Sequence, residues 1–285
     1  MPRTVYVNGE YKPEHEATVS VFDRGFLFAD AVYEVTTVVD GKLIGFEGHM
    51  ERLQRSLDEL SIPHQADREA LLAMHRELVA RNGIDQGMIY LQISRGNPGD
   101  RDFAFPAEDT PVTIVAFTQK KQVVGTAVEE KGLKVVSMDD LRWGRRDIKT
   151  VQLLYPSLAK MEAKRRGADD AWMIQDGHVT EGTSNNAYIV KDGTIVTRDL
   201  SNDILHGITR KAVLEAARSL QMKVEERPFT LEEARAADEA FATSASGFAN
   251  PVVEIDGHTI GDGKPGPVVA RLREAYIEAQ TKVAV

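Results

Sequence analysis

Lys149 and Glu181 are the two residues of this chain whose types and neighbours best suit covalent chemistry. Lys149 follows a turn that contains Arg142, Arg145 and Arg146. Lysine forms an imine with an aldehyde, and only its neutral amine attacks. Nearby positive charges lower the pKa of a lysine and so favour that neutral form. The spacing therefore allows an activated lysine, although a lysine among arginines is also typical of a solvated basic surface.

Glu181 begins a turn of hydrogen-bonding residues, Gly-Thr-Ser-Asn-Asn, directly before a strand-like run. A carboxylate beside a ring nitrogen keeps that nitrogen protonated, so that the ring can accept the electrons of a carbanion. The polar side chains of the turn could lie near a phosphate group. An ordinary glutamate in a polar hairpin would give the same pattern, so both interpretations stay open on these residues alone.

The composition limits the classes of protein to consider. The chain has 285 residues, of which 42% are hydrophobic and 28% charged, as in a globular protein with a substantial core. Its formal charge of −9 argues against nucleic acid as a partner. The absence of cysteine excludes disulfides, zinc–thiolate sites and cysteine nucleophiles. No apolar signal core or bilayer-length apolar run occurs, so we expect a cytoplasmic protein with no membrane partner and no metal site.

Repeated two-residue turns predict largely antiparallel sheets. Asn-Gly or Asp-Gly pairs tolerate the positive φ angles of a type I′ hairpin. They recur between β-rich runs, at positions 8–9, 40–41, 176–177, 192–193 and 256–257. Hairpins of this kind argue against a sheet built from βαβ units. Neither a G-x-G-x-x-G motif nor a G-x-x-x-x-G-K-[ST] motif is present.

Helices alternate with these strands, which predicts an α+β protein with two domains. We expect an N-terminal α+β domain over residues 1–118, an interdomain linker over 119–126, and a C-terminal domain over 127–285. The linker is assigned because this stretch is polar and contains a glycine. The main elements expected are helices over 49–60, 67–82, 155–166, 208–220 and 268–282, and strands over 33–39, 87–94 and 112–118.

Several ordered stretches carry a family resemblance: DRGFLFADAVYEV at Asp23–Val35, GHMERLQRSL at Gly48–Leu57, DIKT around Lys149, TEGTSNNAYIVKDG at Thr180–Gly193 and LHGITR at Leu205–Arg210. Together they resemble the class IV (fold type IV) pyridoxal-phosphate aminotransferases, and the first two resemble the D-amino-acid transaminase branch. The resemblance covers almost the whole chain. It implies a smaller N-terminal α/β sandwich domain, a larger C-terminal domain with a β-barrel-like sheet and helices, and pyridoxal 5′-phosphate as cofactor.

The resemblance also implies roles for the cofactor-binding residues. Lys149 matches the lysine that bonds covalently to the cofactor and transfers the proton, and Glu181 matches the partner of the ring nitrogen. Arg52 matches the arginine that binds the cofactor phosphate, which suits bidentate guanidinium chemistry. The other matching positions are Leu205 against the ring face, Ile208 and Thr209 at a helix start that can bind the phosphate, and Ser244 and Ala245 in a further turn on the phosphate side.

The substrate side departs from the family pattern. Tyr33 matches a tyrosine that lines the substrate side of the ring, and Arg101 matches an arginine that binds the substrate carboxylate from the neighbouring subunit. Phe103 stands where the D-amino-acid branch has a histidine. A clamp shared between subunits predicts a homodimer. The resemblance implies ping-pong amino transfer from a D-amino acid to a 2-oxo acid. A branched-chain L-amino-acid transaminase, an (R)-amine transaminase and an aminodeoxychorismate lyase are alternatives on the same fold.

Overall fold

The computed structural model describes residues 2–285, and they form two compact units. The first unit comprises the chain up to Val124 together with Ile148–Gln152 and Val283–Val285, and the second comprises Gly125–Asp147 and Leu153–Lys282. The last three residues belong to the first unit because the backbone of Val285 pairs with that of Leu43 in both directions.

A six-stranded antiparallel sheet forms the first unit, in the order β2-β1-β6-β5-β3-β4. Its strands are β1 (Thr4–Val7), β2 (Glu10–Pro13), β3 (Ala31–Val39), β4 (Lys42–Ile44), β5 (Gly87–Ser94) and β6 (Thr113–Lys120). β6 continues two residues into the segment expected to be a linker, because Gln119 and Lys120 pair with Met88 and Gly87 of β5.

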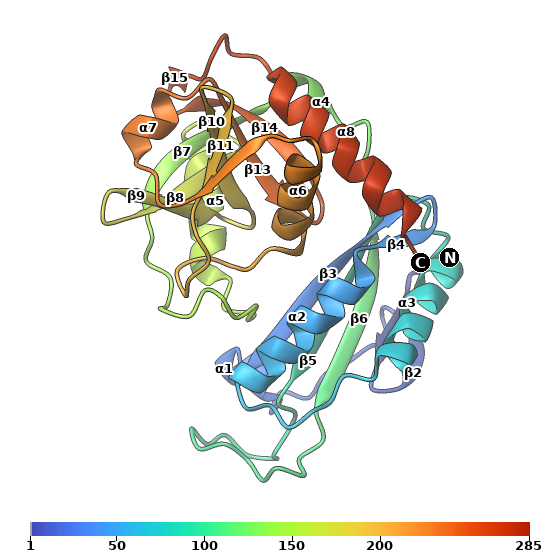
Figure 1. Ribbon diagram of the computed structural model, residues 1–285. Coiled ribbons are helices and arrows are strands. Elements are labelled where there is room, and N and C mark those ends of the chain that lie inside the picture. The colour runs from blue at the N-terminus through green and yellow to red at the C-terminus, as the bar shows by residue number, and fades with distance from the viewer. Residues whose placement is uncertain (1) are drawn as a thin grey trace. The chain divides into compact units, whose positions relative to one another are not determined.

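Two amphipathic helices cover this sheet (Figure 1), α2 (Phe46–Glu59) on β3 and α3 (Arg68–Asn82) on β1 and β6. α3 begins as expected at Asp67, whose carboxylate accepts from the Ala70 N–H at 3.0 Å, and it ends at Gly83 with a φ of 57°. The apolar residues of the two helices pack with those of the sheet in one core, which includes Met50, Leu53, Leu57 and Leu78.

A longer, curled sheet forms the second unit, in the order β12-β11-β10-β13-β14-β7-β8-β9, with β15 pairing on β14. β9 also lies beside β10 in space, so the sheet curls back on itself. The strands are β7 (Leu133–Asp139), β8 (Asp170–Gln175), β9 (His178–Gly182), β10 (Asn186–Lys191), β11 (Thr194–Thr197), β12 (Lys223–Glu226), β13 (Glu239–Ser244), β14 (Phe248–Ile255) and β15 (His258–Thr259). Helices α5 (Leu154–Arg165), α6 (Ile208–Ser219) and α8 (Pro267–Lys282) pack on it, as Figure 1 shows.

The predicted hairpin turns are confirmed. The first residue of each Asn-Gly or Asp-Gly pair has a φ between 48° and 51°, and each turn joins two antiparallel strands. Asn and Asp tolerate this left-handed conformation better than other side chains do, and Gly adopts it freely. Three strand pairs of the second sheet are nevertheless parallel, those of β7 with β8 and with β14 and that of β11 with β12.

Three short helices were not predicted, α1 (Arg24–Phe28), α4 (Ala127–Lys131) and α7 (Leu231–Arg235). Each is too short to show a helical period of apolar residues. A local signal was present for two of them, because α4 and α7 each begin with a capping box of threonine and glutamate. Within residues 2–285, no helix has both the length and the apolar character needed to cross a membrane.

Candidate cofactor and substrate site

Lys149 lies in the short segment Ile148–Gln152, which pairs with the edge of β3. The Tyr33 N–H donates to the carbonyl oxygen of Lys149 at 3.0 Å, and the Lys149 N–H donates to Ser56 Oγ at 3.3 Å. Lys149 Nζ lies 4.3 Å from the centroid of the Tyr33 ring. The structure therefore brings together two of the residues singled out from the sequence, the candidate covalent lysine and the candidate substrate tyrosine.

Arg52 lies on α2 and is held by a carboxylate of β3. Arg52 Nε and Nη2 donate to the two oxygens of Glu34 at 2.8 and 2.7 Å, and His49 Nδ1 lies 2.7 Å from Glu34 Oε2. Glu34 is fully buried. Burial alone would raise the pKa of its carboxyl group, but the charge of Arg52 and its hydrogen bonds lower that pKa to about 2. Glu34 is thus a buried anion that fixes the guanidinium plane of the expected phosphate ligand.

Sequence analysis assigned no role to Glu34. The available signal was one carboxylate within the β-branched run YEVTTVV, where an acidic residue is unusual unless it has a buried partner. Burial also lowers the pKa of the His49 imidazole, against the opposing effect of Glu34. A neutral His49 donates its Nδ1–H to the Glu34 carboxylate, so the group carries one negative and one positive charge.

Glu181 lies at the end of β9 in the second unit, and three groups hold its carboxylate. Arg142 Nη1 donates to Oε1 at 2.5 Å, while Asn186 Nδ2 and the Leu205 N–H donate to Oε2 at 2.9 and 3.0 Å. Glu181 is 4% exposed. Burial raises the pKa of its carboxyl group, and Arg142 and the Leu205 N–H oppose that rise.

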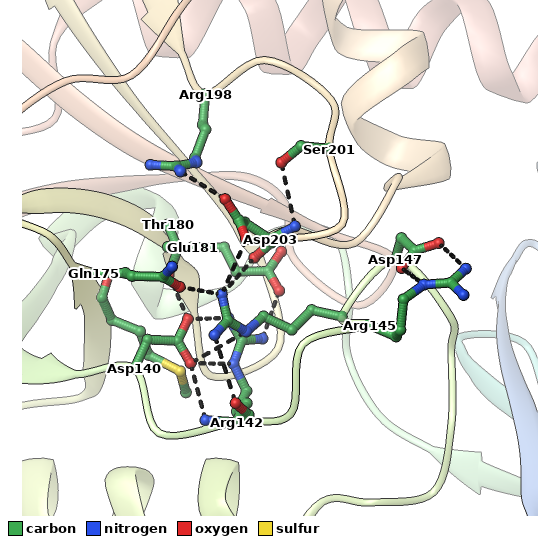
Figure 2. A network of polar contacts seen from close by, with 12 residues as sticks. Asp140, Arg142, Arg145, Asp147, Gln175, Thr180, Glu181, Arg198, Ser201 and Asp203 are labelled. Carbon is green, nitrogen blue, oxygen red and sulfur yellow. Dashed lines mark hydrogen bonds and ion pairs between the residues drawn. The ribbon is translucent and has the colours of Figure 1, made fainter.

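Arg142 is itself fixed by Asp140, as the close-up in Figure 2 shows. Its Nε and Nη2 donate to the two oxygens of Asp140 at 2.9 and 2.6 Å, and Thr180 Oγ1 donates to the same carboxylate at 2.7 Å. Burial opposes the charged form of Arg142, but the Asp140 hydrogen bonds and the Glu181 charge outweigh it and raise the pKa of the guanidinium. Arg142 therefore remains a cation and keeps Glu181 ionised.

The other two arginines of the turn are also paired with acidic side chains. Arg145 Nε donates to Asp147 at 3.0 Å, and Arg146 donates to Gln175 and lies 3.6 Å from Asp203. The sequence argument treated the arginines as unpaired charges that activate Lys149. The structure corrects that picture, because neighbouring carboxylates offset much of their positive charge.

The start of α6 has the features of an anion site. Its N-cap is Gly207, and no side chain of residues 2–285 caps the first turn, which begins with Ile208 and Thr209. The positive end of the helix dipole favours an anion at this point. A Cβ atom on Gly207 would lie 2.2 Å from Asn186 Oδ1, so only glycine allows this approach to the residue that also binds Glu181.

The second expected phosphate contact lies in the turn between β13 and β14. Ser244 is the last residue of β13 and pairs with Phe248, and Ala245 follows in the turn. Phe248 has a φ of 56°, which is an outlier for a bulky residue. Arg273 of α8 donates to the carbonyl oxygens on both sides of Phe248, those of Gly247 and Ala249. Sequence analysis missed Arg273, since nothing in the residue pattern of its helix points to a buried guanidinium.

Arg101 and Phe103 lie in the loop between β5 and β6, and both are exposed. Two buried arginines of the first unit, Arg24 and Arg95, lie at the base of this loop. Sequence analysis assigned them only an auxiliary place in carboxylate binding. The structure instead shows both guanidinium groups bonded to Asp30 at 2.7–2.8 Å.

Comparison with known proteins identifies the family. A model described as amino-transferase class IV matches residues 31–255. The chain belongs to this family. D-alanine aminotransferases from Staphylococcus aureus (strain MSSA476) and Staphylococcus haemolyticus are 38% and 39% identical over 280 residues, which cover 97% of this chain and 99% of each relative. The protein is therefore a transaminase, and the family predicted from its sequence is confirmed.

Solved structures confirm the fold of this aminotransferase. A branched-chain aminotransferase from the archaeon Thermoproteus uzoniensis, with norvaline, has a TM-score of 0.84 and 27% sequence identity, and the comparison covers 97% of this chain and 94% of that one. A bacterial-type branched-chain enzyme of T.th., complexed with N-(5′-phosphopyridoxyl)-L-glutamate, has a TM-score of 0.88 and 28% identity over 99% of this chain and 95% of that one. A second structure of the T.th. enzyme contains pyridoxamine 5′-phosphate. The expected α+β architecture of fold type IV is thus confirmed.

Pyridoxal 5′-phosphate is the cofactor of class IV aminotransferases, and this chain has groups that fit it. The Lys149 amine suits the aldehyde, and the ion-paired Glu181 carboxylate suits a protonated ring nitrogen. The uncapped start of α6 suits the phosphate. The donor set therefore agrees with the cofactor of the family.

Proposed function

We propose that this aminotransferase moves the amino group of a D-amino acid, of the D-alanine or D-glutamate type, to a 2-oxo acid. The observation that carries the proposal is the 36–39% identity with D-alanine aminotransferases over nearly their full length. The Ala31–Val35 stretch of β3, which contains Tyr33, also resembles that branch more than the branched-chain enzymes.

Each site residue has a proposed task. Bound pyridoxal 5′-phosphate supplies an electron sink for the substrate Cα. Lys149 binds the cofactor aldehyde, is displaced by the amino donor, and then moves the proton between the substrate Cα and the cofactor C4′. Glu181 holds the proton on the ring nitrogen. Tyr33 lines the substrate side of the ring. Release of one 2-oxo acid before the next binds makes the kinetics ping-pong.

The remaining residues hold the cofactor in place. Arg52, the N–H groups of Ile208 and Thr209, and the turn at Ser244 and Ala245 bind the phosphate, and Leu205 packs on the ring. These tasks follow from the family resemblance, and the geometry of each unit is compatible with them.

Replacing Lys149 tests the covalent role. We expect Lys149→Ala to purify without the visible absorbance band that borohydride bleaches in the wild type, because the variant has no amine to bond with the aldehyde at this position. Lys131→Ala, which changes an exposed lysine of α4, should keep the band. A Lys149→Ala protein whose band is still bleached by borohydride would contradict the assignment.

A half-reaction screen tests the substrate. The holoenzyme is mixed separately with D-alanine, D-glutamate, L-leucine and (R)-1-phenylethylamine, and conversion of the cofactor to its amine form is followed by absorbance. Conversion by the D-amino acids supports the proposal. Conversion by L-leucine alone supports the second candidate, a branched-chain enzyme, which the TM-score of 0.88 favours. Pyruvate release without a keto acceptor would indicate the lyase.

We also propose a homodimer, because the loop with Arg101 and Phe103 is expected to serve the site of a neighbouring subunit. Large apolar side chains are exposed near that loop in the first unit, including Phe26 at 73% and Phe103 at 76%. Gel filtration of the active enzyme tests this, and elution at the monomer mass of 31.5 kDa would contradict it. A cytoplasmic location stays a prediction, to be checked by cell fractionation.

A further inference from the structure

Two buried arginines fix the base of the loop between β5 and β6, which extends from the end of the sheet near α1 (Figure 1). Arg24 Nε and Arg95 Nε donate to the same Asp30 oxygen at 2.8 and 2.7 Å, and Arg95 Nη2 donates to the other oxygen at 3.1 Å. Arg24 is 3% exposed and Arg95 is 4% exposed. Buried charges are costly unless they are paired and hydrogen-bonded, so this cluster favours one arrangement of the loop base.

Arg24 also reaches the outer part of the loop. Its Nη1 donates to the carbonyl oxygens of Asp102 and Ala104 at 2.6 and 3.1 Å. These carbonyl groups lie on either side of Phe103 in the chain. The backbone at Phe103 is therefore held from a buried residue, although the Phe103 side chain is 76% exposed.

Two phenylalanine rings flank the guanidinium of Arg101. Arg101 Cζ lies 5.0 Å from the centroid of Phe28 and 4.9 Å from that of Phe103, and the two centroids are 5.4 Å apart. Both distances are within the range of cation–π attraction. On its other contact, the Phe28 ring lies 4.6 Å from Arg24 Cζ. The same buried arginine thus supports both rings, one through its backbone and one through its face.

We propose that Phe28 and Phe103 form an aromatic bracket that holds Arg101 in place to bind a substrate carboxylate beside an apolar surface, and that Arg24 is the positioning residue of this bracket. The inference deepens the proposed aminotransferase function and rests on it. It gives Phe103 a task that differs from that of the polar residue found there in the D-amino-acid branch.

The physical advantage of the bracket is order before binding. A free arginine side chain loses up to about 2 kcal/mol of rotamer entropy when a ligand fixes it. Stacking on aromatic faces restrains the planar guanidinium and leaves its edge for bidentate contact with a carboxylate. The rings add apolar surface next to that contact. The substrate class that fits is a 2-amino or 2-oxo acid with an apolar side chain.

The test compares donors with and without a carboxylate. Stopped-flow half-reactions of the holoenzyme with D-phenylalanine and with (R)-1-phenylethylamine give an apparent Kd and a saturating rate for each. We expect Arg101→Gln to raise the Kd of D-phenylalanine about tenfold or more. Phe103→Leu should raise it about two- to fivefold at an unchanged saturating rate. The Kd of the amine should not change in either variant.

Arg24→Lys tests the positioning role, because lysine cannot hold both carbonyl groups and Asp30 in the same geometry. It should raise the Kd of D-phenylalanine in the wild-type background and have no further effect in the Arg101→Gln background. Phe26→Leu, a similarly exposed phenylalanine of α1, is the matched control and should match the wild type. Phe103 is exposed, so Phe103→Leu tests the bracket even if Arg24→Lys does not fold.

The outcomes separate the bracket from the proposed function. Equal changes in Kd for acid and amine, or effects of Phe103→Leu and Arg101→Gln that multiply independently, would overturn the bracket. If the wild type converts no donor, the proposed function fails, and calorimetric binding of 3-phenylpropionate to the holoenzyme then tests the bracket alone. Tighter binding of 3-phenylpropionate than of propionate, weakened by Phe103→Leu, supports it. No binding, or no effect of the substitution, overturns it.

Discussion

Replacing Glu34 by glutamine should cost this enzyme about 3 kcal/mol of folding free energy at pH 7. The carboxylate is fully buried and accepts three hydrogen bonds, two from Arg52 and one from His49. Its pKa is lowered from 4.5 to about 2, which corresponds to about 3 kcal/mol at roughly 1.4 kcal/mol per pH unit. Breaking a buried ion pair from one side costs about 3–5 kcal/mol, which agrees with that figure.

The pH dependence has a definite sign. Because the folded state has the lower pKa, the contribution of Glu34 is fully present above pH 4.5 and is lost as the pH falls toward 2. About 2 kcal/mol of it should remain at pH 3.5. The stability difference between wild type and Glu34→Gln should therefore narrow by about 1 kcal/mol between pH 7 and pH 3.5, since glutamine does not titrate.

The assay has to follow the first unit. Both tryptophans, Trp143 and Trp172, belong to the second unit, so fluorescence would report the wrong part of the chain. Urea unfolding is better followed by far-ultraviolet circular dichroism and by hydrogen exchange of peptides from β3 and α2. Glu77→Gln is the control, because its ion pair with Arg81 on α3 is 45% exposed on both sides and should contribute less than about 1 kcal/mol.

A double-mutant cycle decides whether the energy belongs to the pair. Arg52→Met and Glu34→Gln together should be less destabilising than the sum of the single changes by about 2 kcal/mol, because either change alone leaves a buried group without its partner. Additive effects within about 0.5 kcal/mol, or a loss in Glu34→Gln that does not vary with pH, would refute the reasoning.

Two further predictions concern other buried groups. Burial lowers the pKa of His75 to about 4, so protonation at low pH favours unfolding, and its contribution should fall by about 2 kcal/mol between pH 7.5 and pH 5. His75→Leu should flatten this part of the urea-stability profile, and an unchanged slope would contradict the assignment. Arg142→Met leaves the Glu181 carboxylate without its cation and raises its pKa further. The single-turnover rate should then fall at least tenfold at pH 7 and recover as the pH rises, whereas a uniform loss from pH 6 to pH 9 would contradict this.

Local chemistry explains which parts of the fold the sequence could predict. The hairpin turns depend on two adjacent residues, and β5 was predicted at its observed bounds because its apolar pattern is continuous from Gly87 to Ser94. The boundaries of α3 were fixed by Asp67 and Gly83. α1 could not be predicted in this way, since its five residues offer no period and its cap, Asp23, lies in a polar stretch with no other helix signal.

Long-range pairing explains what the sequence could not supply. Glu34 and Arg52 are both visible in the sequence, but their bond depends on the packing of α2 against β3. The pairing of Arg142 with Glu181 likewise depends on the curl of the second sheet, and it changed the expected role of that arginine from activating a lysine to holding a carboxylate. Phe103 was recognised as a departure from the family, but its contact with Arg101 required coordinates.

The division of the chain between the two units has a consequence for its synthesis. The first unit includes Ile148–Gln152 and Val283–Val285, so it is complete only after residue 285 has left the ribosome. Until then β4 lacks the backbone pairing of Leu43 with Val285, and an open strand edge invites contact with other chains. The segment with Lys149 joins β3 from more than a hundred residues away, a non-local contact that slows folding. We therefore expect the nascent N-terminal half to need protection from aggregation until the second unit has been made.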